Sequence, residues 1–162
     1  MNFVKIQTID TSWVDIKETL LNSTFTGYEI PKNQTLECAW DFRLYSSKEI
    51  GLVFCSEVTS FGGWEEIGVL KISAKEVKNI DRNPEIYTFQ EIENFIVSDV
   101  LVLESIDGGN TVECGIKLIN TNKEQLLITT SPAPGAVSID ACFSNDKFNP
   151  EVSLEFCNFT NN

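Results

Sequence analysis

The alternation of apolar and polar residues over residues 112–118 is the feature that most restricts the fold of this chain. Period-two alternation is typical of a strand with one buried face. Apolar runs of strand length also cover residues 100–104, 125–130, 137–143 and 152–159. Turn-forming residues separate these runs, as at 107–110, where Asp-Gly-Gly-Asn favours a hairpin. A doubly wound α/β fold needs strands and helices in alternation, so this part of the chain excludes it.

The first two thirds of the chain mix helix and strand patterns. Ser12 with Asp15 forms a capping pair ahead of a helical apolar stripe, and similar pairs that begin at Ser73 and Thr88 predict two further helices. Strands are expected between them, over residues 36–44, 50–58 and 67–72. The sequence therefore predicts one α+β domain over residues 1–162, with an antiparallel or mixed β-sheet of about eight strands and two or three helices.

The strand expected at residues 36–44 carries a prediction about its two faces. Trp40 shares a face with Cys38 and Phe42, so we expect its ring to be buried. Arg43 lies on the opposite face and is expected to be exposed. A chain of this length can bury a sizeable core without a metal ion or a disulfide bond.

Charge is distributed unevenly along the chain. The sequence holds 12 basic and 24 acidic residues, a net charge of −12. Residues 83–162 contain three of the basic and twelve of the acidic residues. A field of this sign repels phosphate backbones and anionic lipid, so we expect no binding to nucleic acid or membranes. It attracts basic proteins, although an acidic surface can also serve solubility alone.

The residue types needed for common catalytic sites are missing. The sequence has no histidine, which removes the commonest general base and the usual zinc ligand. Its five cysteines have no C-x-x-C spacing, and residues 1–10 lack a secretory signal, so we expect buried, reduced thiols in a cytoplasmic protein. Neighbouring acids such as Glu91 and Glu93 could serve a glycosidase, yet so acidic a chain produces such pairs by chance. We expect no metal site, no cofactor and no enzymatic activity.

One stretch of the second half has the layout strand, polar turn, strand, proline-broken bend and strand. It comprises Gly115–Leu118 and Leu126–Ile139, with Pro132 and Pro134 in the bend. This stretch resembles the C-terminal half of small bacterial cytosolic proteins. Some of these are encoded beside secreted toxins, as immunity proteins of contact-dependent growth inhibition or polymorphic toxin systems. The resemblance implies a protein that binds and neutralises a basic toxin domain, such as a nuclease, by blocking its active or substrate-binding surface.

Two interpretations follow from the sequence, and both are non-catalytic. The first is the immunity protein, and the alternative is a β-rich ligand-binding or accessory domain. For the first, a basic partner should meet acids near turns and strand ends, together with an aromatic anchor. The candidate partner-binding residues are Trp64, Glu65, Glu66, Asp107, Asp140, Asp146 and Glu151. The sequence leaves the oligomeric state open.

Overall fold

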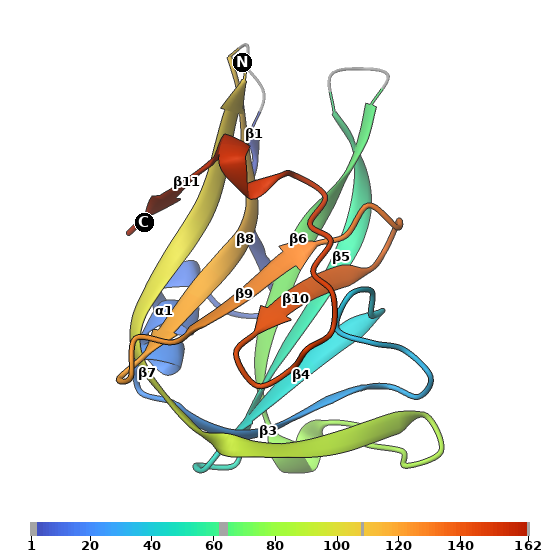
Figure 1. Cartoon of the computed structure of the whole chain (residues 1–162), viewed down its shortest axis with the longest axis vertical. Helices are drawn as coiled ribbons and strands as arrows, with labels where there is room; N and C mark the ends of the chain where they lie inside the picture. The colour runs from blue at the N-terminus through green and yellow to red at the C-terminus, as the bar shows by residue number, and fades with distance from the viewer. Residues whose placement is uncertain (1–2, 62–64, 108, 162) are drawn as a thin grey trace.

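The computed structural model of the chain describes residues 3–61, 65–107 and 109–161 (Figure 1). Within these ranges the helical segments are α1 (Trp13–Leu21) and the 3-10 turns η1 (Val77–Asn79) and η2 (Leu154–Phe156). The strands are β1 (Phe3–Val4), β2 (Gln7–Thr8), β3 (Thr24–Pro31), β4 (Asp41–Ser46), β5 (Ile50–Phe61), β6 (Glu65–Glu76), β7 (Tyr87–Asp107), β8 (Asn110–Asn120), β9 (Gln125–Thr130), β10 (Val137–Ala141) and β11 (Cys157–Thr160).

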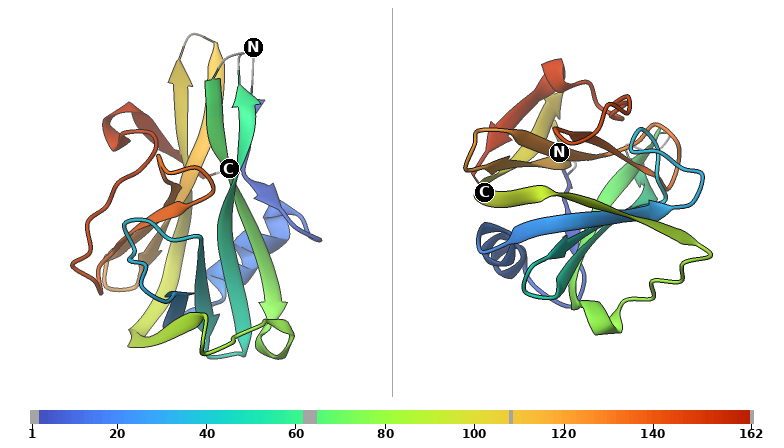
Figure 2. Two further views of the ribbon diagram at one scale, coloured as in Figure 1. Left: turned by 90° about the vertical axis from the view of Figure 1, so that its right-hand side faces the viewer. Right: turned by 60° about the horizontal axis from the view of Figure 1, so that its bottom comes forward.

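These strands form one mainly antiparallel sheet in the order β10-β9-β8-β7-β3-β4-β5-β6-β2, with β1 added to β8 and β11 to β7. The 21-residue strand β7 links the two halves of the sheet, because its first half pairs with β3 and its second half with β8. Between these halves the register shifts, so that residues 92–94 of β7 lie opposite Thr26 alone. The strand bends there, and the sheet folds over so that β8, β9 and β10 lie across β5 and β6 (Figures 1 and 2).

The expected α+β fold with about eight strands and two or three helices is wrong. Strands account for 59% and helical segments for 10% of the structure, which has one α-helix and eleven strands in the described ranges. Residues 73–76 continue β6 and pair with residues 50–53 of β5, and residues 88–96 belong to β7 and pair with β3. Pairing with strands distant in sequence thus outweighs the local capping patterns at Ser73 and Thr88.

The helix predicted after Ser12 is confirmed. The Ser12 hydroxyl accepts a hydrogen bond from the backbone N–H of Asp15 (3.2 Å), which caps the first turn of α1. Ile16 and Leu20 are buried in the main core and pack α1 against the sheet. The described ranges contain no helix of the length and apolar character needed to cross a membrane.

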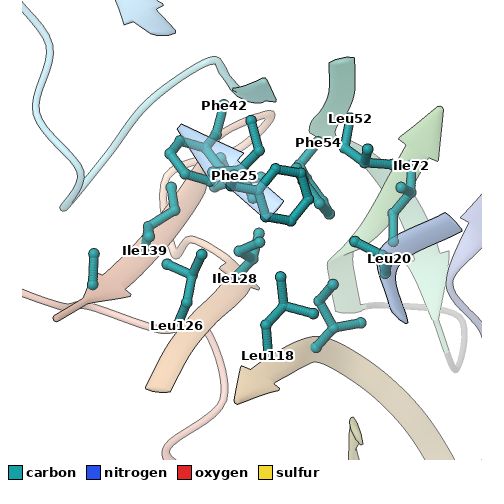
Figure 3. Close-up of a cluster of buried hydrophobic side chains, with 14 of the residues drawn as sticks. Leu20, Phe25, Phe42, Leu52, Phe54, Ile72, Leu118, Leu126, Ile128 and Ile139 are labelled. Atoms are coloured by element: carbon teal, nitrogen blue, oxygen red, sulfur yellow. The ribbon is translucent and has the colours of Figure 1, made fainter. Parts of the chain in front are cut away.

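The main core lies between the two folded halves of the sheet (Figure 3). One wall comes from Phe42, Phe54 and Ile72, which stand side by side in the registers of β4, β5 and β6. The opposite wall comes from β8, β9 and β10 and includes Ile128 and Ile139. All these side chains are fully buried, and burial of each contributes about 1.5–3 kcal/mol to folding.

The prediction for Trp40 and Arg43 is reversed in the structure. Trp40 precedes β4 and is 71% exposed, whereas Arg43 is 7% exposed. Phe42 does face the core, as expected, but the opposite face of β4 is covered as well. The connection between β6 and β7, residues 77–86, lies against that face; its Asp81 carbonyl accepts from Arg43, and its Arg82 donates to Glu29. When both faces of a strand are covered, the alternation of its residues does not show that the second face is buried.

Candidate functional site

The acidic residues predicted to bind a partner lie in several places in the sheet. Trp64 and the side chain of Glu65 fall outside the described residues. Glu66 is exposed on β6 and lies with Glu151 beside a small hollow of about 130 Å³. Glu151 accepts hydrogen bonds from the backbone N–H of Gly68 (3.0 Å) and from the Thr130 hydroxyl (2.9 Å), and so holds the C-terminal segment against β6 and β9. Burial raises the pKa of Glu151 despite these hydrogen bonds.

The other predicted acids occupy strand ends and the segment after β10. Asp107 is exposed where β7 turns into β8, opposite Asn110. Asp140 is exposed on β10. The Asp146 carboxylate accepts a hydrogen bond from the Leu36 N–H (3.1 Å), so one of its oxygens is engaged within the fold. Asp146 and Glu151 are thus tied to the backbone of distant segments.

A charged cluster around Glu29 covers the outer face of β3 and β4. The Glu29 carboxylate accepts hydrogen bonds from the guanidinium groups of Arg43 (3.4 Å) and Arg82 (2.9 Å) and from the hydroxyl of Tyr45. Glu29 and Arg43 lie opposite each other in the ladder, and both are buried. The Arg82 guanidinium also lies over the Tyr45 ring, 4.1 Å from its centre. All donors around Glu29 therefore come from the sheet itself and from the connection between β6 and β7.

Asp41 forms the second anionic centre of the cluster. Its Oδ2 accepts from Arg43 Nε (3.3 Å) and from the Tyr87 hydroxyl (3.2 Å), while its Oδ1 is buried without a hydrogen-bond partner. Burial raises the pKa of Asp41, against the lowering effect of Arg43. The Arg43 guanidinium stacks on the Tyr87 ring at 3.6 Å and donates to the Asp81 carbonyl (2.6 Å).

Shifted pKa values often mark active sites, but the geometry of this cluster indicates a structural role. The Glu29 carboxylate is surrounded by three donors and is 3% exposed, so no substrate atom can approach it. Burial and the hydrogen bond to Glu29 raise the pKa of Tyr45, which keeps that hydroxyl protonated as a donor. The cluster fastens residues 81–89 to the sheet through charge-assisted hydrogen bonds.

A hollow lined by acidic side chains lies beside the first half of β7 and has a volume of about 530 Å³. Residues 92–95 of β7 form one side, and the end of β8 with the following turn contributes Asn120, Asn122 and Glu124. Cys142 and Phe143, which follow β10, complete the lining. Its volume is within the range of about 300–1,000 Å³ that is usual for ligand sites.

The lining of this hollow is acidic and polar around an apolar floor. Glu93 and Glu124 supply carboxylates, and Phe95 and Phe143 supply rings. Burial raises the pKa of the Cys142 thiol, and the carboxylates of Glu124 and Asp140 raise it further. No lysine or arginine belongs to the lining as described. A cationic side chain would therefore meet complementary charge in this hollow.

The sequence does not predict this surface, because the apolar spacing of residues 88–96 favours a helix. In sequence, Glu91 and Glu93 are only neighbouring acids, and nothing near Glu124 marks it as a site residue. The signal that could have found them is the concentration of β-forming residues, since Tyr87, Thr88 and Phe89 precede the two acids in a strand-like run.

The five cysteines differ in burial. All five cysteines are free, but Cys114 alone is buried and Cys142 is exposed, so the expectation of five buried thiols is wrong. Among the described residues, no group of three or more cysteine, aspartate or glutamate side chains is placed to hold a metal ion. Comparisons with protein-family models, with curated protein sequences and with solved structures gave no match.

Proposed function

We propose that this chain is a non-catalytic inhibitor that binds a basic protein domain, as a bacterial immunity protein binds its toxin. The observation that carries the proposal is a group of exposed acids without ion-pair partners at one hollow. Glu93 and Glu124 line one hollow, and Glu91 is exposed on the same strand as Glu93. No ion pair joins any of these three acids to a lysine or arginine within the described part of the chain.

Arg43, which is buried, and Arg82, which is half-buried, support this view because both are paired within the fold. Arg43 and Arg82 both bind Glu29, and Arg43 also binds Asp41. These pairs neutralise buried charges, so the unpaired acids dominate the field that a partner meets. An acidic surface of this kind attracts basic domains and raises their association rate.

A nuclease toxin offers the matching chemistry. Enzymes that act on nucleic acid carry basic surfaces because they bind phosphate. An acidic protein placed over such a surface occupies the substrate path and repels the nucleic acid. Inhibition of this type needs a preformed complementary surface and no reactive group. The Glu29 cluster is consistent with this, because its carboxylate is already fully engaged by donors of the fold.

The test is co-expression in bacteria with the toxin domain encoded by the gene immediately upstream. We expect the chain to restore growth and to co-purify with the toxin in a one-to-one complex. Association should slow markedly between about 0.05 and 0.5 M salt, because exposed charges are screened at high ionic strength. A catalytically inactive toxin controls for effects of expression on growth.

The contrary outcome is equally specific. If the neighbouring gene encodes no secreted toxin, or if the chain neither protects the cell nor binds the domain, the proposal is wrong. The alternative, a non-catalytic β-rich ligand-binding or accessory domain, would then apply.

A further inference from the structure

The first half of β7 is a strand with one open side. β3 pairs with residues 87–91, 95 and 96, whereas β8 and β11 pair only with residues from Val97 onward. The ladder with β3 is preceded by a hydrogen bond from the Lys32 N–H to the Ile86 carbonyl (2.8 Å). Such pairs recur at every second residue of an antiparallel ladder, so the backbone groups of Phe89 and Glu91 face away from β3.

The contacts of Glu91 agree with this orientation. Its carbonyl oxygen accepts a hydrogen bond from the side-chain amide of the adjacent residue Gln90 (3.2 Å). No other strand of the described chain pairs with this side of residues 88–94. The open side therefore offers the N–H groups of Phe89 and Glu91 and the Phe89 carbonyl to an incoming strand, whereas the Glu91 carbonyl already accepts from the Gln90 amide.

The edge of the sheet at β10 is covered by the chain itself. Ala39 exchanges two backbone hydrogen bonds with Val137 of the terminal strand β10, at 2.8 and 2.9 Å, and the Leu36 carbonyl accepts from the Ile139 N–H (2.7 Å). β11 likewise covers part of the second half of β7. Covering is expected, because an open edge is a template for pairing with another chain. The first half of β7 is instead left open beside the acidic hollow.

The wall opposite this edge is held in a fixed conformation. The side-chain oxygen of Asn120 accepts from the backbone N–H groups of Asn122 (3.0 Å) and Glu124 (2.8 Å), and its amide donates to the Glu124 carboxylate (3.1 Å). Asn120 is 2% exposed, so this turn is anchored in the protein interior. A partner entering the hollow meets a wall that needs no ordering, which reduces the entropic cost of binding.

The charges on the edge decide what can occupy it. A second copy would bring Glu91 and Glu93 close to the same acids of its partner, and like charges across a pair of strands are destabilising. An extended segment with lysine or arginine at alternate positions would meet these acids and Glu124 with the opposite charge. Half-exposed Phe89 adds apolar contact at the same edge.

We propose that the open edge of β7, residues 88–94, is the docking site for an extended lysine- or arginine-rich segment of a basic protein, which adds to the sheet as a further strand. This inference rests on the proposed function and names the surface that performs it. At ~3.3 Å per residue, a segment of about seven residues would span the edge. Backbone hydrogen bonds would provide affinity, and the alternate cationic side chains would provide selectivity.

A peptide experiment tests the strand geometry on the intact chain. The probe is a ten-residue peptide in which lysine alternates with threonine, and its control is the same peptide with every second backbone nitrogen methylated. Both carry the same charge, but the methylated peptide cannot donate along one edge. We expect amide NMR shifts at residues 88–95 and 120–124 with the first peptide, and hydrogen-exchange protection of the Phe89 and Glu91 amides. The control should bind more than about tenfold more weakly.

Variants of the chain test the location. Glu91→Lys with Glu93→Lys should weaken binding of the unmethylated peptide more than about tenfold. Glu18→Lys with Glu155→Lys makes the same change in net charge at exposed sites on α1 and η2, which do not line the hollow, and should change binding little. Equal binding of the two peptides, no binding at millimolar concentration, or equal effects of the two double variants would overturn the proposal. If a basic toxin domain still binds the Glu91→Lys, Glu93→Lys chain at full strength, the docking site is wrong and the proposed function stands. If no such domain binds the natural chain, the proposed function fails.

Discussion

Replacing Arg43 by alanine should destabilise the protein strongly, because this side chain connects both anionic centres of the outer cluster. Its guanidinium lies 3.4 Å from Glu29, 3.3 Å from Asp41 and 2.6 Å from the Asp81 carbonyl. After truncation, Glu29 would keep Arg82 and Tyr45 as donors. Asp41 would keep the Tyr87 hydroxyl, but its Oδ1 already lacks a partner and the carboxylate would lose its neighbouring positive charge.

The expected cost is about 3–5 kcal/mol, the range for removing one partner of a buried ion pair. We expect a cost near the lower end of this range, because the Glu29 carboxylate keeps two donors and the Asp41 carboxylate can bind a proton. With a urea dependence of about 1–3 kcal/mol per molar, a loss of about 3 kcal/mol lowers the unfolding midpoint by ~1–3 M. Urea unfolding followed by circular dichroism measures this directly.

Two controls separate the ionic effect from lost packing. Trp40→Ala removes a larger side chain that is 71% exposed, and should cost about 0.5 kcal/mol or less. Asp41→Asn in the Arg43→Ala background removes the uncompensated charge, and should restore about 1 kcal/mol or more of the loss. Similar midpoints for the Arg43→Ala and Trp40→Ala chains would refute the assignment of Arg43 to a buried ion pair.

Three further results are expected. Burial raises the pKa values of Asp41 and Glu151 above their values in the unfolded chain. The free energy of unfolding should therefore increase as pH falls from 7 through these raised pKa values, and level off below about pH 4. In urea titrations at successive pH values, Asp41→Asn and Glu151→Gln should each make this increase smaller. Gly115→Ala should cost about 1–3 kcal/mol, because the added methyl group would overlap a carbonyl oxygen of β9; an unchanged melting temperature would contradict this contact. The sulfur atoms of Cys114 and Cys157 lie 3.2 Å apart, so oxidation by diamide, which accepts the two thiol hydrogens, should form a disulfide that links β8 to β11. Peptide mapping without reductant would locate this disulfide, and Cys157→Ser should prevent it.

The parts of the fold that could be predicted depend on local chemistry. The Ser12 cap and the alternation of 112–118 each specify a conformation with residues close in sequence, and both are found in the structure. Asp107 and Asn110 pair as a hairpin at 107–110 requires, although residue 108 lies outside the described ranges. The segment 88–96 could not be assigned in this way. Its apolar residues fit a helical stripe and a strand equally well, and the choice is made by β3, about sixty residues earlier in the chain.

The environment of Arg43 and the open edge of β7 were hidden for a related reason. Whether the outer face of β4 is wet or covered depends on where residues 77–86 pass, and no pattern within β4 encodes that path. An edge is likewise defined by the absence of a neighbouring strand. Composition predicts an acidic surface, whereas strand order decides which acids border an open backbone.

The Glu29 cluster and the open edge of β7 are connected through the same strand. Tyr87 stacks on Arg43, and the Phe89 ring lies near the Arg82 guanidinium (5.3 Å) and the Tyr45 ring (6.2 Å). These contacts attach the first half of β7 to the sheet from its outer face, while β3 holds one side of its backbone. The other side can therefore remain unpaired without the strand fraying. An edge that is already fixed before its partner binds loses little conformational entropy on binding. Most of the free energy of charge attraction and backbone hydrogen bonding then contributes to the affinity. On this reasoning, Arg43→Ala should weaken the binding of a basic partner as well as lower the stability of the fold, although the buried Arg43 side chain does not itself contact the partner.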